Sequence, residues 1–423
     1  MKRERGSRKN RRKSTGRAAP TGRRSARAGA LDGVRVLDLT RAMAGPYCTL
    51  ILGDLGAEIL KIEEPLKGDE TRAWGPPFVR EESAYFMSAN RNKKSVAINL
   101  KHPAGRKLLE RLLPLSDVLV ENFRPGTLAR LGFDPKRLER RYPKLIVCSI
   151  SGYGSDGPDR DRPGYDLILQ GEGGLMSLTG ERHGPPSKVG VAVADIGAGM
   201  FAALGVLAAL TARERSGRGQ CVSTSLLEGQ VAWLTYMAGN YFATGRNPER
   251  PGNAHPSIVP YQSFQTRDIP LTVAVNNEKL WEGFCRALGL ERLRDDPRYA
   301  TNPQRVRNRN TLVPEIEAYF AAASGRDILK RLRSAGIPCG PIRTVAEVCE
   351  DPQVLHRRMV RRMRHPAAGA VRLLGNPIKL SRTAGSAGTS PPTLGQHTDE
   401  ILRRQLGLRA GEIRALREAG AIR

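Results

Sequence analysis

One carboxylate in this 423-residue chain stands apart from every other charged group. Asp195 is the only ionisable residue between Lys188 and Arg213. A short apolar run ends at Asp195, and the pattern of a long helix rich in small residues begins just after it. An aspartate at a helix start commonly accepts hydrogen bonds from the first amides as a cap. The positive end of the helix would also keep the carboxylate ionised, as a nucleophile requires. Asp195 is therefore a candidate cap, a candidate nucleophile, or both.

The other reactive residue types do not form a common catalytic or metal motif. The six histidines show neither HxH nor HxxxH spacing, which argues against a zinc site. The chain has no GxSxG elbow and no phosphate-loop GxxxxGK[ST] motif. Its six cysteines are scattered without a CxxC pair or a signal peptide, which favours reduced thiols in a cytosolic-type compartment. We expect no metal ion and no permanently bound cofactor.

The elements before Asp195 alternate between strand and helix patterns. Helices are predicted over 44–57 and from Pro103 onward. Buried strands are predicted over 34–39, 58–63, 95–99, 117–122 and 144–150. This alternation predicts an α/β fold with a doubly wound parallel sheet, in which ligands bind at the carboxyl ends of the strands. We expect the loops 90–94 and 121–126 there, with amide and basic groups suited to phosphate.

The rest of the chain suggests further domains. A helix is predicted over 196–215, and a loop rich in Pro, Asn and Gly over 245–260 is a plausible boundary. A smaller α+β domain is expected after it, and strands near Val371 and Ile378 precede a helical C-terminal end. We therefore divide the chain into a basic tail (1–30), a large domain (31–244), a linker and small domain (245–351) and a C-terminal part (352–423).

The net charge of +27 is concentrated at the N-terminus. Residues 1–30 hold twelve Lys and Arg against one Glu, a net charge of +11, and no Leu, Ile, Val or aromatic residue. Such a segment cannot bury a core, so we predict a disordered tail, with nucleic-acid binding as its weaker alternative. The most apolar run, 189–210, is interrupted by Asp195 and four glycines, so no membrane partner is expected.

Ten segments, in this order, resemble the class III CoA transferases, also called the CaiB/BaiF family. They include LDGVRVLDLTRAMAGP (31–46), ENFRPG (121–126), GYDLILQGEGGLMSLTG (164–180), VADIGAGM (193–200) and LGQHTDEIL (394–402). The resemblance implies a Rossmann-like large domain, a smaller domain, and a C-terminal part that returns to the large domain. It also implies an interlocked homodimer.

The resemblance also implies roles for individual residues. Asp195 matches the aspartate that attacks an acyl-CoA thioester, giving an anhydride and then an aspartyl-CoA thioester. CoA, a substrate here, would contact Ala42, Ile98, Lys101, Asn122, Phe123 and Arg130. Met43 replaces a glutamine, and Glu64 an arginine, found in some members.

Two hypotheses about the activity follow from this resemblance. Segments 74–79, 90–95 and 255–268 are most similar to those of succinyl-CoA:glutarate (or hydroxymethylglutarate) CoA-transferases, so the expected reaction moves CoA from succinyl-CoA to a dicarboxylate. Arg41 or Arg91 would then hold the distal carboxylate. The alternative is a 2-methylacyl-CoA racemase, but its histidine position holds Tyr165. Tyrosine, with a reference pKa near 10, is a poor two-way proton carrier at neutral pH. A cytoplasmic location is expected, or the mitochondrial matrix in a eukaryote.

Overall fold

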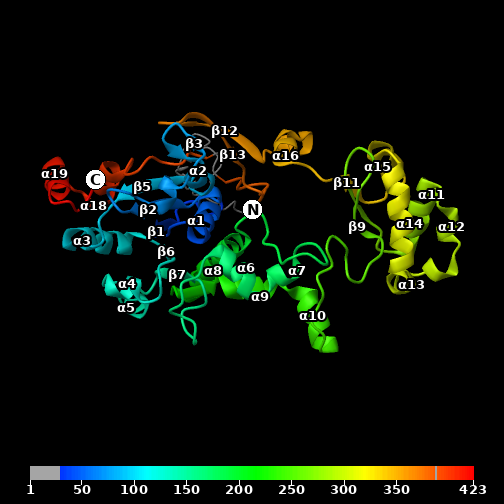
Figure 1. Cartoon of the computed structure of the whole chain (residues 1–423). Coiled ribbons are helices and arrows are strands. Elements are labelled where there is room, and N and C mark those ends of the chain that lie inside the picture. The colour runs from blue at the N-terminus through cyan, green and yellow to red at the C-terminus, as the bar shows by residue number, and fades with distance from the viewer. Residues whose placement is uncertain (1–28, 386–387) are drawn as a thin grey trace, which may run out of the picture.

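The computed structural model describes residues 29–385 and 388–423. The predicted disordered tail therefore falls almost entirely outside the described residues. Within them, the largest sheet has six parallel strands, hydrogen-bonded in the order β5-β2-β1-β6-β7-β8 (Figure 1). Numbered along the chain, these strands have the order 3-2-1-4-5-6, which is the doubly wound Rossmann arrangement. Their bounds are β1 Arg35–Asp38, β2 Glu58–Glu63, β5 Lys93–Ala97, β6 Val118–Glu121, β7 Ile146–Ser151 and β8 Cys221–Ser225. The predicted α/β class is confirmed.

Helices cover both faces of this sheet because successive strand residues point to opposite sides. Val36 belongs to a core formed with α1 (Ala44–Asp54) and α8 (Val193–Ser216). Its neighbour Leu37 belongs to the opposite core. The helices of that second core are α3 (Pro103–Leu112), α18 (Thr398–Leu406) and α19 (Ala410–Glu418). The C-terminal helices therefore pack on the same sheet as the first strands.

Helix α8 begins earlier than the sequence pattern indicated. Its cap is Ala192, so Asp195 is the third helical residue and does not cap the helix. The glycines do not interrupt the helix either, and its 24 residues are long and apolar enough to cross a membrane. Half of its most apolar window is buried, and α8 packs on α1, α9 (Leu226–Trp233), β7 and β8. These contacts place it in the core of the fold.

Helices α1 and α8 approach each other closely through small residues. A Cβ added to Gly199 would lie 2.5 Å from the carbonyl oxygen of Ala44 and 3.2 Å from the backbone nitrogen of Cys48. The close packing ties the first turns of both helices together. It therefore fixes where Asp195 lies relative to the end of β1.

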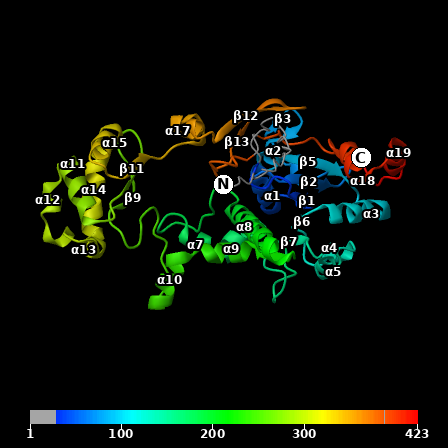
Figure 2. The same ribbon diagram turned by 180° about the vertical axis from the view of Figure 1, so that it is seen from behind.

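A separate core lies in a smaller unit that stands apart from the main sheet in both Figure 1 and Figure 2. Its antiparallel sheet contains β9 (Tyr261–Phe264), β10 (Leu271–Ala274) and β11 (Cys339–Pro341). Helices α11 (Glu278–Leu288), α14 (Arg309–Ala322) and α15 (Gly325–Ser334) complete its core. Two segments of chain join this unit to the larger part (Figures 1 and 2).

Two local predictions are wrong. Ile378 is not in a strand: the C-terminal hairpin is formed by β12 (Val360–His365) and β13 (Gly369–Leu374). Loop 90–94 does not follow a strand either, because it comes after α2 (Ala84–Ala89) and runs into the start of β5. It therefore lies at the amino end of that strand, away from the expected ligand edge.

The remaining elements are short. They are η1 Glu70–Ala73, β3 Phe78–Val79, β4 Glu82–Ser83, η2 Leu113–Leu115, α4 Thr127–Arg130, α5 Pro135–Arg141, α6 Asp166–Glu172, α7 Leu175–Leu178, α10 Thr235–Thr244, α12 Glu291–Arg294, η3 Pro297–Tyr299, α13 Asn302–Arg307, α16 Val345–Glu350 and α17 Pro352–His356.

Candidate active site

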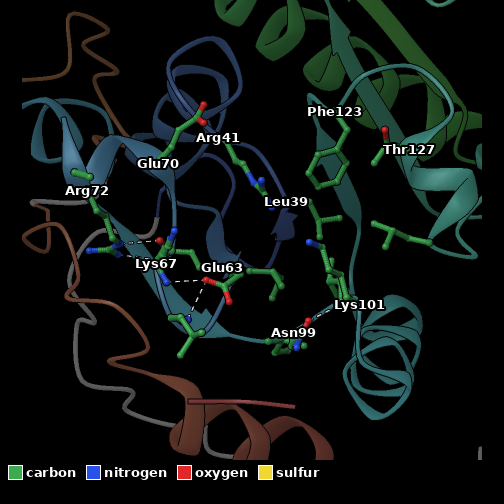
Figure 3. A pocket seen from close by; sticks show the side chains of 18 of the residues that line it. Leu39, Arg41, Glu63, Lys67, Glu70, Arg72, Asn99, Lys101, Phe123 and Thr127 are labelled. Carbon is green, nitrogen blue, oxygen red and sulfur yellow. Dashed lines mark hydrogen bonds and ion pairs between the residues drawn. The ribbon is translucent and has the colours of Figure 1, made fainter. Parts of the chain in front are cut away.

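A cavity of about 1120 Å³ opens at the carboxyl ends of β1, β2, β5 and β6. This is the edge where doubly wound sheets bind ligands, and it spans the point between β1 and β6 where the strand order reverses. Figure 3 shows its lining, with Arg41 and Phe123 on facing sides and Lys101 with Asn99 near its floor. We call it the large cavity. It is lined by Leu39, Arg41, Ile62, Glu63, Glu64, Leu66, Lys67, Gly68, Glu70, Arg72, Ala73, Trp74, Ile98, Asn99, Leu100, Lys101, Phe123, Thr127 and Leu131.

The large cavity combines apolar walls with cations that have no acidic partner. Arg72 is neutralised by Glu63, at 2.8 Å. Arg41, Lys67 and Lys101 form no ion pair with any described residue. Apolar walls together with unpaired cations suit a ligand that carries both phosphates and apolar parts.

A second cavity, of about 440 Å³, contains Asp195, and we call it the Asp195 cavity. Its lining comes from the ends of β1, β6 and β7, from the starts of α6, α8 and α9, and from the loops between them. It is lined by Arg41, Ala42, Ala44, Glu70, Trp74, Tyr85, Asn122, Phe123, Arg124, Pro125, Ile150, Ser151, Gly152, Arg162, Pro163, Gly164, Tyr165, Asp166, Leu167, Ala192, Asp195 and Leu226. Arg41, Glu70, Trp74 and Phe123 line both cavities, so the two adjoin. An elongated ligand in the large cavity can therefore extend toward Asp195.

Asn122 fixes the boundary between the two cavities. Its Oδ1 accepts a hydrogen bond from the backbone N–H of Arg41 at 2.9 Å, and its Nδ2 donates to the carbonyl oxygen of Arg41 at 2.8 Å. The guanidinium of Arg41 lies 5.5 Å from the centre of the Phe123 ring, in cation–π contact. Asn122 thus links the ends of β1 and β6 across the reversal point, and its amide is already engaged by the protein.

Two buried ion pairs hold the turn between β1 and α1. Lys61 Nζ lies 2.9 Å from both Asp69 Oδ2 and the carbonyl oxygen of Thr40. The other oxygen of Asp69 accepts from the backbone N–H of Ala42 at 3.3 Å. Ala42 has a φ of 61°, a left-handed conformation that costs a non-glycine residue energy. The ion pair therefore offsets this strain and sets the shape of the turn that carries Ala42.

Behind this turn lies the second pair, Lys93 and Asp38, whose side chains are completely buried. Lys93 Nζ is 3.1 Å from Asp38 Oδ2 and donates to the carbonyl oxygen of Pro46 at 3.0 Å. Burial lowers the pKa of Lys93 to about 8, while Asp38 opposes that shift. Leaving either charge without its partner in this position would be costly.

Asp166, not Asp195, satisfies the first turn of α8. Asp166 Oδ1 accepts from the backbone N–H of Ala194 at 2.8 Å, and its Oδ2 accepts from Gln170 Nε2 at 2.8 Å. No described residue donates a hydrogen bond to the carboxylate of Asp195. The carboxylate of Asp195 is thus free to meet a ligand.

The surroundings of Asp195 oppose its ionisation. Burial, assisted by the negative charge of Asp166, raises the pKa of Asp195 to about 7. Burial and the nearby Asp195, Asp166 and Asp69 together raise the pKa of Tyr85 to about 12. Tyr85 is therefore a protonated phenol beside a carboxylate poised near neutrality. A carboxylate with so raised a pKa is more basic, and so more nucleophilic, than an ordinary aspartate.

The structure places most of the predicted site residues in the lining of the two cavities. Ile98 and Lys101 line the large cavity, Ala42, Asn122 and Asp195 line the Asp195 cavity, and Phe123 lines both. Arg130 lines neither: its Nη2 donates to Thr127 Oγ1, and Thr127 lines the large cavity instead. Arg41 lines both cavities, whereas Arg91 is buried in an ion pair with Asp54 and lines neither.

Tyr85 and Asp166 were not among the predicted site residues. Asp166 directly follows Tyr165, which takes the position of the racemase histidine, so the sequence did contain a signal for Asp166. Tyr85 lies in a short helix between loops, where nothing in its spacing distinguishes it from a core aromatic residue. No described histidine lines the Asp195 cavity, and Tyr165 is 62% exposed. The described lining of the Asp195 cavity thus lacks the histidine that the racemase alternative requires.

Comparison with known proteins extends this picture. The model of the CoA-transferase family III matches residues 31–398. Succinyl-CoA:glutarate CoA-transferase of Mus musculus is 44% identical over 392 residues, covering 93% of this chain and 90% of its own. Succinate–glutarate CoA-transferase of Agrobacterium fabrum is 40% identical, covering 88% and 94%. A CaiB/BaiF family protein from Brucella suis superposes with a TM-score of 0.80 at 39% identity, covering 89% of this chain and 100% of its own.

Proposed function

The chain belongs to the CoA-transferase family III and is therefore a CoA-transferase, and we propose that it moves CoA from succinyl-CoA to glutarate or a closely similar dicarboxylate. Relatives with 40–44% identity carry names for this reaction. We propose Asp195 as the nucleophile. The observation that carries this assignment is the free carboxylate of Asp195 in a cavity adjoining the large cavity.

The proposed reaction proceeds through covalent steps on Asp195. Its carboxylate attacks the thioester carbonyl of succinyl-CoA, giving a mixed anhydride and CoA thiolate. The thiolate then attacks the aspartyl carbonyl, releasing succinate and leaving an aspartyl-CoA thioester. The acceptor carboxylate attacks that thioester and expels the thiolate. The thiolate finally attacks the acceptor's carbonyl, which gives the new acyl-CoA and frees Asp195. The atoms balance because succinate leaves with the bridging oxygen that came from Asp195. Asp195 regains an oxygen from the acceptor's carboxylate when the thiolate cleaves the second anhydride.

The chain's own residues supply binding, exclusion of water and proton control for these steps. Lys67 and Lys101 would hold the phosphates and the nucleotide in the large cavity, with Ile98 and Phe123 against its apolar parts. Burial strips water from Asp195, which strengthens its attack on the thioester. The protonated hydroxyl of Tyr85 is a donor suited to an oxyanion formed near Asp195.

We also propose that the enzyme is a homodimer. Large apolar side chains of α8 and α10 are exposed in the single chain, including Leu204 at 59% and Phe242 at 80%. Exposed apolar surface favours burial against a partner. A second copy would cover it, in keeping with the interlocked arrangement implied by the family resemblance.

The substrate assignment is tested by steady-state kinetics with succinyl-CoA and a series of acceptors. We expect glutarate to have a kcat/KM at least about tenfold above that of butyrate, because only a dicarboxylate can pair its second charge with a cation such as Arg41. Equal kcat/KM values for the two acids would contradict the dicarboxylate assignment. No release of succinate with any acceptor would contradict the donor assignment.

A further inference from the structure

A third cavity, of about 520 Å³, lies between α10 of the larger part and α14 of the smaller unit. It shares no lining residue with the large cavity or the Asp195 cavity. Among the described residues that line it, the charged ones are four arginines and one glutamate: Arg182, Arg246, Arg250, Arg309 and Glu249. The lining therefore carries a clear excess of positive charge.

The arginines here are not satisfied by carboxylates, apart from one exposed pair. Arg182 lies 3.2 Å from Glu249, and both side chains are more than half exposed. Arg250 Nη1 donates to the carbonyl oxygen of Gly184 at 3.0 Å, but its Nε is buried without a partner among the described residues. A buried N–H that lacks an acceptor costs free energy unless a ligand supplies one.

Arg309 adds a second half-buried cation to the same cavity. Its Nη2 donates to the carbonyl oxygens of His255 and Pro256, at 2.8 and 3.1 Å. Burial and the nearby positive charge of Arg182 lower the pKa of Arg309. Two guanidiniums that repel each other at the wall of a cavity are stabilised by an anion placed between them.

The rest of the lining identifies the kind of anion. Apolar side chains of Met237, Val313 and Pro314 line the cavity together with the cations. A phosphate ion has no apolar part to place against them. A short aliphatic dicarboxylate has both anionic and apolar parts. Its carboxylates can pair with the planar guanidiniums, and its methylene groups can pack against the apolar side chains.

We propose that this third cavity is a binding site for a small aliphatic dicarboxylate, distinct from the site of CoA transfer, with Arg182, Arg250 and Arg309 as its anion-binding groups. The proposal does not require glutarate to be the acceptor in the reaction. The loop that carries Arg182 runs on to Val189, whose N–H donates to Gln170 Oε1 at 2.8 Å. Gln170 in turn donates to Asp166, so a ligand in this cavity lies one short loop from the carboxylate pair.

The test is isothermal titration of the full-length enzyme with succinate and glutarate, and with butyrate and inorganic phosphate as comparison ligands. We expect the wild type to bind succinate and glutarate in this cavity. We expect Arg182→Gln and Arg250→Gln each to weaken this binding at least about tenfold, since each removes a charged donor. Arg267→Gln, an exposed arginine of the smaller unit outside the cavity, should leave dicarboxylate binding unchanged.

The variants also guard against a folding artefact. Arg182 is exposed, so Arg182→Gln should keep the wild-type melting temperature without ligand. No dicarboxylate binding to the wild type, or dicarboxylate binding that neither substitution weakens, would overturn the proposal. Arginine-dependent binding of butyrate or phosphate as tight as that of glutarate would overturn the ligand class. These outcomes are independent of acceptor kinetics, so failure here is distinguishable from failure of the proposed function.

Discussion

At the scale of single residues, the site depends on two carboxylates with separate tasks. Asp166 accepts hydrogen bonds from the start of α8 and from Gln170, which leaves Asp195 without a donor of its own. The sequence identified Asp195 because of its isolation, but it predicted the wrong structural role for it, since spacing alone could not show that another residue satisfies the helix. The separation of roles follows from the approach of α6 to α8, which is a tertiary contact.

Replacing Asp166 by Asn should move the pH dependence of the reaction. The negative charge of Asp166 contributes to the raised pKa of Asp195, so its removal lowers that pKa by a fraction of a unit. The nucleophile must be ionised, so the acid limb of kcat/KM should lie near pH 7 in the wild type and at lower pH in Asp166→Asn. Asp161→Asn, at an exposed position outside the Asp195 cavity, is the matched control. An unmoved acid limb in Asp166→Asn would show that the two carboxylates are not coupled.

Substitution of Asp195 should stabilise the fold at high pH. The folded chain keeps the proton of Asp195 up to about pH 7, whereas the unfolded chain releases it near pH 4. Ionisation therefore favours unfolding as pH rises between these values, and the loss of stability is complete above pH 7. Asp195→Asn removes this effect, so its free energy of unfolding should exceed the wild-type value by about 1–2 kcal/mol at pH 8 and by little at pH 4. Urea unfolding at both pH values measures it, and a larger gain at pH 4 would contradict the raised pKa.

At the scale of elements, the ends of β1 and β6 and the first turns of α1 and α8 define the site. Strand bounds in the sheet were largely predictable, because buried runs of Val, Leu and Ile alternate with helices along the chain. Loop 90–94 was misplaced because its basic residues were interpreted as a phosphate loop. Arg91 and Lys93 are instead buried against Asp54 and Asp38. A basic residue at a ligand edge and one in a buried pair have the same sequence signature.

The bridge between β1 and β6 should matter for substrate binding. Asn122→Ala removes both hydrogen bonds to the backbone of Arg41, which loosens the wall shared by the two cavities. We expect KM for the acyl-CoA to rise about 5–30-fold, on the basis of about 1–2 kcal/mol for two hydrogen bonds, with a smaller change in kcat. Asn276→Ala, an exposed position in the smaller unit, should change neither constant. A fall in kcat without a change in KM would contradict a positioning role for Asn122.

The close contact of α1 and α8 predicts a sharp difference between two glycine substitutions. Gly199→Ala places a methyl group 2.5 Å from the carbonyl oxygen of Ala44, so it should destabilise the fold by about 1–3 kcal/mol. Gly411→Ala in α19 meets nothing within 4 Å, so it should be neutral or slightly stabilising. Denaturant unfolding of both variants is the measurement. Equal stabilities would show that α1 and α8 are not in close contact.

At the scale of the whole molecule, the main sheet with a core on each face and the smaller unit with its own core are joined by two segments of chain (Figure 1). Helices from the C-terminal part pack on the first strands of the sheet. The α/β class and the family were predictable from motifs that each span only a few residues. The meeting of the large cavity with the Asp195 cavity was not, because it brings together Trp74, Tyr85, Phe123 and Asp166 from separate elements. Motif spacing cannot encode such a convergence.

The proposed dimer gives a prediction at this scale. Phe242→Asp places a charge on the exposed apolar surface of α10, so it should weaken self-association. Light scattering after size-exclusion chromatography should give twice the chain mass for the wild type and a larger monomer fraction for the variant. Leu66→Asp, an equally exposed apolar position at the large cavity, is the control for the charge itself. A monomeric wild type at micromolar concentration would refute the dimer.

The proposed reaction requires the carboxyl group of one side chain to become covalently attached, through its oxygen to the substrate's acyl group and through its carbon to the sulfur of CoA. The most direct measurement is mass spectrometry of peptides after the enzyme is incubated with succinyl-CoA and quenched with hydroxylamine. We expect a hydroxamate on the peptide that contains Asp195. This hydroxamate should be absent when succinyl-CoA is omitted and absent in Asp195→Asn. Full turnover with an unmodified Asp195, or a hydroxamate at another carboxylate, would contradict it.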